Sequence, residues 1–223
     1  MSEQGFTDVE ITYMKNEING EDAQSLFNGL KTIANLSALT LYLDINDISD
    51  EGGKLLASSL SNCINISTLA FNLDDNQIRS QTLQCFGQAF LNCPKLSTLK
   101  LSLRTTQINY KGASNLMNDL AKCAKLSILD LDFSNNEIGD QGVQNLGLAL
   151  QMSVGISSLT ISLNDNRITN QGIKTLGLVL VKCNNIQILE LDFCQNFIQQ
   201  EFQQNLRIKT LKMQRLVKPT IHF

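Results

Sequence analysis

Hydrophobic and polar positions along the chain repeat with a period of thirty residues. The most regular apolar position carries isoleucine in every unit: Ile18, Ile48, Ile78, Ile108, Ile138, Ile168 and Ile198. A strict period over a whole chain is typical of a solenoid, because each unit is one supersecondary element that buries its apolar face only against its neighbours.

Each unit combines two kinds of hydrophobic spacing. Leu39, Leu41 and Leu43 alternate with polar residues, which predicts a strand with one buried face. Later in the unit apolar residues follow helical spacing, as at 143, 146, 147 and 150. The pattern predicts parallel strands centred near residues 9, 41, 71, 101, 131, 161 and 191, with six full helices between them.

Strand, turn, helix and loop within thirty residues predict an α/β solenoid with right-handed crossovers. Strands stack about 4.8 Å apart and helices about 8–10 Å apart, so we expect a horseshoe with the parallel sheet on its concave face and the helices on its convex face. We interpret residues 1–223 as a single domain: seven units from about residue 6, and a partial capping strand at 216–223 whose paired part covers 220–223.

Polar residues recur where the chain leaves each strand and enters each helix. Asparagine follows the strand at positions 16, 46, 76, 136, 166 and 196, and is expected to form a ladder between units. Thr106 interrupts that ladder, so a looser turn is expected in the third unit. Asp50, Ser80, Asp140 and Asn170 are expected to be helix N-caps.

These positions form the pattern LxLxxNxI followed by a helix, seen clearly at Ile138–Gly142 and Ile168–Gly172. The chain thereby resembles the leucine-rich repeat proteins of the ribonuclease-inhibitor-like class, over the sequence from about residue 6 onward. Its strands are two residues longer than in that class, and in this it is similar to repeat arrays abundant in ciliated protozoa, some of them attached to predicted kinases. The resemblance implies a protein-binding role.

The net charge of −3 is unevenly distributed. Residues 201–223 carry +4, which leaves −7 on the first 200 residues. A predominantly acidic chain argues against nucleic-acid binding, which requires a basic surface. The sequence shows neither a signal peptide nor a membrane span, so we expect a cytoplasmic protein, with cytoskeletal or ciliary association left open.

The sequence offers little catalytic chemistry. Phosphate-binding and kinase motifs are absent, no CxxC metal motif occurs, and His222 is the single histidine, so we expect neither enzyme activity nor a cofactor. The repeat register brings Cys194, His222 and Asp192 together as a candidate nucleophilic arrangement, but a frayed chain end without catalysis is the favoured interpretation. Cys63, Cys93, Cys123 and Cys183 share one repeat position and are expected to be buried, reduced packing residues.

The outward strand positions on the concave face carry seven acidic and two basic residues. We expect a protein with a basic surface to bind there, although a merely solvated polar face remains the alternative. The candidate residues are Tyr42, Asp44, Asp74, Lys100, Arg104, Asp130, Asp132, Glu190 and Asp192.

Two further hypotheses involve other surfaces. Leu148, Leu178 and Ile208 form an apolar row on the convex side, which fits a scaffold component that packs through its helices and its ends. The first strand has only Asp8 and Glu10 to discourage edge pairing, so self-association or a partner strand is expected there. A detached regulatory segment related to kinase-fused arrays is a third interpretation.

Overall fold

The structure is a computed structural model that describes residues 8–18, 20–30, 33, 35–60 and 63–223. All its strands belong to one open parallel sheet, in the order in which they occur along the chain. The strands are β1 (Asp8–Thr12), β2 (Ala38–Tyr42), β3 (Thr68–Asn72), β4 (Thr98–Ser102), β5 (Ile128–Asp132), β6 (Ser158–Ser162), β7 (Ile188–Asp192) and β8 (Lys218–His222).

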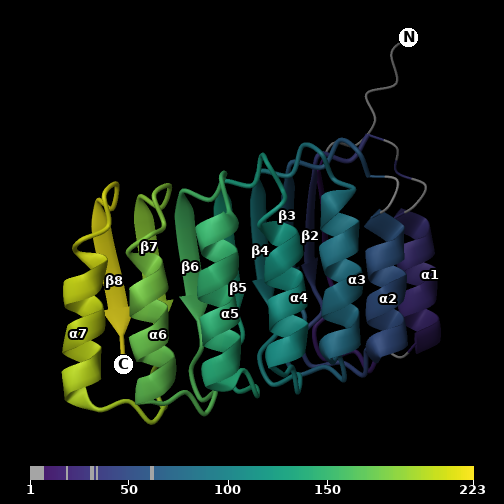
Figure 1. The fold of residues 1–223 in the computed structure, drawn as a ribbon. Helices are drawn as coiled ribbons and strands as arrows, with labels where there is room; N and C mark the ends of the chain where they lie inside the picture. Colours follow the sequence, from purple (N-terminus) through teal and green to yellow (C-terminus); the bar gives the residue numbers. More distant parts are fainter. Residues whose placement is uncertain (1–7, 19, 31–32, 34, 61–62) are drawn as a thin grey trace.

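A helix follows each strand except the last, and the helices pack side by side on one face of the sheet (Figure 1). The helices are α1 (Gly20–Leu30), α2 (Asp50–Ser59), α3 (Ser80–Leu91), α4 (Tyr110–Leu120), α5 (Gly139–Met152), α6 (Asn170–Leu180) and α7 (Gln200–Thr210). The predicted strand–helix alternation is therefore confirmed, and β8 occupies most of the expected capping strand. We call the sheet face opposite the helices the open face.

Neighbouring strands pair with an offset of thirty residues along the whole sheet, so equivalent residues form straight rows across it. The inward rows are sealed: Leu39, Leu41 and Leu43 in β2 and the loop after it are fully buried. Phenylalanines enlarge the core locally, and the Phe86 ring lies 5.7 Å from the Phe90 ring and 6.2 Å from the Phe71 ring. Alternation with period two thus places every outward strand residue on the open face.

The predicted asparagine ladder forms between successive units. The Asn136 side chain accepts a hydrogen bond from the backbone N–H of Ile108 at 2.8 Å and donates to the carbonyl oxygens of Leu103 at 2.8 Å and Phe133 at 3.0 Å. Each such side chain therefore joins two strand ends, its own and that of the preceding unit. The shorter Thr106 side chain donates its hydroxyl to the Leu103 carbonyl of its own strand end at 2.6 Å and lies 3.4 Å from Asn136 Oδ1 of the following unit.

The four residues expected to be N-caps are instead the first or second residues of their helices. Their side chains bond to the next unit: Asp50 Oδ1 accepts from the backbone N–H of Arg79 at 2.8 Å, and Ser80 Oγ accepts from that of Asn109 at 3.2 Å. The predicted caps therefore lie one or two positions beyond the observed N-caps, and the side chains of Asp50 and Ser80 bond to the next unit rather than to their own helix. These side chains fix the helix starts of consecutive units to one another.

β8 is the last strand of the sheet, and two features leave its free edge with few available hydrogen-bonding groups. Pro219 lies within β8 opposite Leu189, and the backbone N–H of Phe193 donates to the carbonyl of His222 at 2.9 Å. Alternate residues of a strand direct their backbone groups to opposite edges, so the backbone groups of Pro219 and Ile221 face away from β7. Pro219 has no donor to offer there, and the Ile221 carbonyl accepts a 3.0 Å bond from the Arg207 guanidinium.

No helix within the described part of the chain is long and apolar enough to cross a membrane.

Candidate functional site

Two pairs of acidic residues lie near each other on the open face, one on β5 and one on β7. The register places Thr160 between Asp130 and Glu190, and Ser162 between Asp132 and Asp192, so the neutral strand β6 separates the two acidic strands. We call Asp130 and Asp132 on β5 and Glu190 and Asp192 on β7 the two acidic rows. Because strands are spaced about 4.8 Å apart, the two acidic rows lie roughly 10 Å from each other. This spacing limits their mutual repulsion and leaves a polar strip between them.

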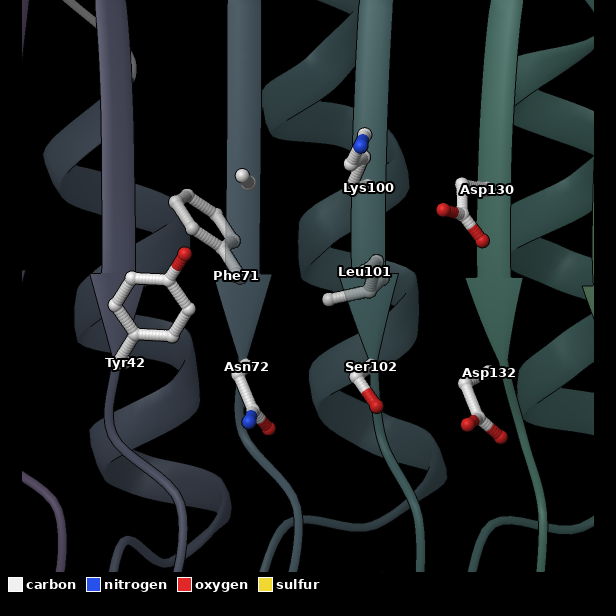
Figure 2. Close-up of a pocket in the computed structure, with 9 residues that line it drawn as sticks. Tyr42, Phe71, Asn72, Lys100, Leu101, Ser102, Asp130 and Asp132 are labelled. Carbon is white, nitrogen blue, oxygen red and sulfur yellow. The ribbon is translucent and has the colours of Figure 1, made fainter.

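A hollow of about 300 Å³ lies beside the β5 carboxylates on the open face (Figure 2). Figure 2 shows the Tyr42 ring on one side and Asp130 and Asp132 on the other, and Lys100 and Ser102 lie between them on β4, the strand next to β5. Lys100 and Tyr42 are exposed, whereas the two aspartates are half-buried. The hollow therefore combines an exposed aromatic ring with two carboxylates.

The hollow also contains residues that were not singled out from the sequence. Ala70, Asn72 and Ser102 occupy outward positions in β3 and β4 and line it together with the predicted residues. The repeat register was the available signal, because Asn72 lies next to Tyr42 in β2 and next to Ser102 in β4. The small side chain of Ala70 leaves room between its larger neighbours.

Partial burial shifts the pKa of two carboxyl groups on the open face. Burial raises the pKa of Asp130, and the nearby Asp132 and Glu190 carboxylates raise it further, while Lys100 opposes the shift. Burial likewise raises the pKa of Asp74, against hydrogen bonds from the Ser102 hydroxyl at 2.6 Å and the Arg104 backbone N–H at 2.8 Å. A cationic ligand would therefore stabilise the ionised form of both carboxyl groups.

Asp44 was expected to belong to this accessible surface, but its side chain is buried and only 7% of the residue is exposed. Its Oδ1 has no hydrogen-bond partner among the described residues. The backbone rows continue past the strand ends here, where Lys15 N–H bonds to the Asp44 carbonyl and Ile45 N–H bonds to that of Asp74. The equivalent bond from the Asp75 N–H to the Arg104 carbonyl flanks Asp74, yet Asp74 and Arg104 remain accessible.

At the other end of the sheet, Asp192 lies opposite His222, as expected from the repeat register. Burial acts to raise the pKa of Asp192, but bonds from the Cys194 N–H at 3.0 Å and from Asn164 at 3.0 Å, together with His222, lower it overall. The same contact raises the pKa of the Cys194 thiol, chiefly through its hydrogen bond to Asp192. A nucleophilic cysteine requires the opposite shift.

The helical side of the molecule carries the predicted apolar row. Leu148 on α5, Leu178 on α6 and Ile208 on α7 are 45%, 56% and 54% exposed. The helices that carry them pack in sequence, α5 against α6 and α6 against α7. The row therefore runs across three adjacent helices.

The comparisons with known proteins identify the repeat. A family model described as Leucine Rich repeat matches residues 39–57 and 124–147. No curated protein matches the chain.

Similar solved structures include a Bacteroides fragilis protein, which is 14% identical with a TM-score of 0.48, and the Rad7–Elc1 complex in yeast, which is 15% identical with a TM-score of 0.40. The alignments cover 96% and 92% of this chain but only 64% and 61% of those chains. The matched segments lie in two of the units that share the thirty-residue offset and the buried leucine rows. The chain therefore contains leucine-rich repeats.

Proposed function

We propose that this chain is a single-domain, non-catalytic module that binds another protein through the open face of its sheet. The observation that carries the proposal is the pair of acidic rows on β5 and β7, with the Tyr42 hollow next to them. A repeat solenoid suits this role because it presents a large surface on a rigid frame. The acidic rows favour a partner segment rich in lysine or arginine.

The geometry supports contact by several basic side chains at once. Carboxylates on alternate strands accept cations from an extended segment that crosses the sheet, and the Tyr42 ring offers a face for a cation–π contact. The half-buried Asp130 and Asp132 would contribute more than fully exposed acids, because screening by water and salt is weaker there. Lys100 and Arg104 would orient the segment by repelling its basic residues toward β5 and β7.

A selection from a random peptide library on the intact chain tests this proposal. We expect the enriched peptides to be basic, and their affinity to fall at least tenfold in a variant with Asp130→Lys and Glu190→Lys. The matched control is Glu51→Lys with Glu201→Lys, which changes the net charge equally on exposed helix positions. Enriched peptides without basic residues, or equal losses in both variants, would exclude an acidic binding face.

The alternative is a scaffold component that packs through its helices and its ends, including self-association at the β1 edge. The exposed row of Leu148, Leu178 and Ile208 favours this reading, because a row of large apolar side chains across three helices is a common feature of protein interfaces. Sedimentation of the parent chain and of the Leu178→Asp variant measures whether the chain self-associates through this row. A monomer at all concentrations in both proteins would remove self-association through this row.

A further inference from the structure

The free edge of β1, on the side away from β2, carries backbone groups that no other strand of the described structure pairs with. The Tyr13 N–H donates to the Tyr42 carbonyl at 2.8 Å, so the odd-numbered residues of this segment direct their backbone groups toward β2. The backbone groups of Asp8, Glu10 and Thr12 consequently face away from the sheet. Among the described residues, no strand pairs with this edge.

Side chains near this edge are also incompletely covered. Val9 and Ile11 are only partly buried, whereas Leu39 and Leu41, which occupy the same positions in β2, are fully buried. Tyr13 is 47% exposed, while its equivalent Leu43 is fully buried. One more strand on this edge would cover the apolar row and satisfy the free backbone groups.

The charges near the edge define which strand fits. Asp8 and Glu10 are exposed on the open face, and the Ser37 hydroxyl donates to Asp8 Oδ1 at 2.8 Å. An added strand would place alternate residues beside these two acids and the intervening residues over Val9 and Ile11. The complementary strand therefore alternates basic and apolar residues.

A second copy of the chain fits this edge poorly. Two β1 strands that pair antiparallel through this edge would place Glu10 opposite Glu10, or Asp8 opposite Glu10, and like charges directly opposite each other oppose association. The free edge of β8 would continue the parallel sheet, but Pro219 lacks a donor there and the Ile221 carbonyl is occupied by Arg207. Arg207 is further held by its position 5.5 Å over the Phe223 ring.

We infer that the free edge of β1 binds an extended segment of another protein in which basic and apolar residues alternate. Recognition occurs by strand addition, with backbone hydrogen bonds to Asp8, Glu10 and Thr12 and with salt bridges on the open face. This site is distinct from the acidic rows on β5 and β7. Binding at the β1 edge is independent of whether a partner also binds the acidic rows.

The probe is a synthetic peptide of alternating lysine and valine, compared with a peptide of the same composition in which lysines and valines form two blocks. We expect the alternating peptide to bind the intact chain at least tenfold more tightly, and to slow hydrogen exchange at the Glu10 and Thr12 amides. Equal binding of the two peptides, or protection confined to β5–β7, would overturn the inference.

Two variants separate backbone pairing from simple charge attraction. Asp8→Lys with Glu10→Lys should weaken the alternating peptide at least tenfold. Thr12→Pro should do the same with both acids intact, because it removes a donor at the free edge but none in the β1–β2 ladder. Glu51→Lys with Glu201→Lys is the charge-matched control and should leave the affinity unchanged.

Circular dichroism identifies a variant that fails to fold. In that case, hydrogen exchange at the Glu10 and Thr12 amides of the parent chain still shows whether the alternating peptide binds the β1 edge. Sedimentation provides the last arm. A dimer of the parent chain that dissociates on charge reversal at Asp8 and Glu10 would show that the edge binds a second copy instead.

Discussion

The carboxylate of Asp140 accepts two hydrogen bonds from Thr169 in the following unit, one from its backbone N–H at 2.7 Å and one from its hydroxyl at 2.6 Å. Thr169 is the N-cap of α6, and its hydroxyl also accepts a bond from the Gln171 N–H. One carboxylate at the start of a helix therefore positions the start of the next helix.

Replacing Asp140 with alanine should lower the free energy of unfolding by about 1–2 kcal/mol, because it removes charge-assisted bonds and loosens a helix cap. Urea denaturation measures this loss. Glu137→Ala is the control, since the Glu137 side chain forms an exposed ion pair with Arg167 at 3.3 Å, and such pairs contribute at most about 1 kcal/mol. Equal losses in the two variants would refute the capping role of Asp140.

The asparagine ladder should be a major source of stability. Asn136→Ala leaves the Ile108 N–H and the Leu103 carbonyl without this partner in a buried environment, so we expect a loss of about 3 kcal/mol. Asn16→Ala removes an exposed side chain at the same repeat position and should cost about 1 kcal/mol or less. Thermal or urea unfolding compares the two, and a smaller loss for Asn136→Ala than for Asn16→Ala would contradict the ladder.

Ile45 has a positive φ of 56° just after β2. A β-branched residue is unfavourable in this left-handed region, whereas asparagine tolerates it. Ile45→Asn should therefore stabilise the fold by about 1 kcal/mol. The reverse exchange, Asn135→Ile at a φ of 55°, should destabilise it by a similar amount. A stabilising effect of Asn135→Ile, measured by urea denaturation, would show that φ does not govern this position.

The buried thiols predict a loss of stability at alkaline pH. Burial raises the pKa of Cys93 to about 12 and that of Cys183 to about 11, from an ordinary value of 9.0. Between pH 9 and 11 the unfolded chain therefore releases thiol protons that the folded chain retains, so the free energy of unfolding falls as pH rises.

Unfolding of the parent chain is compared with that of Cys93→Ala with Cys183→Ala at pH 8 and at pH 10.5. We expect a smaller alkaline loss in the variant than in the parent. Identical losses would mean that these thiols ionise equally well in the folded state.

The fold was largely predictable because the thirty-residue period specifies which residues face the core. Ile108 and Leu131 belong to repeat positions that are buried in unit after unit, whichever residue is taken as the start of a unit. The positions of strands and helices therefore follow from the spacing of apolar residues alone. The period does not reveal which unit a side chain contacts, and this explains why Asp50 and Ser80 were assigned to their own helices. Their carboxylate and hydroxyl groups reach the next unit instead.

Local enclosure was the second property beyond the reach of the sequence. Asp44 and Asp74 share one repeat position, yet Asp44 is buried and Asp74 remains partly accessible. Cys123 is likewise more accessible than Cys63 and Cys93, although all three were expected to be buried. Such differences depend on the residues in flanking units, and the repeat pattern does not encode them.

The most direct test of the open face as the binding surface is an amide chemical-shift map of the chain bound to a peptide selected on it. The account predicts perturbations in β5 and β7, around Asp130, Asp132 and Glu190, that weaken as salt is raised. Perturbations confined to α5–α7, around Leu148 and Leu178, and insensitive to salt, would contradict it and assign the interaction to the helical side.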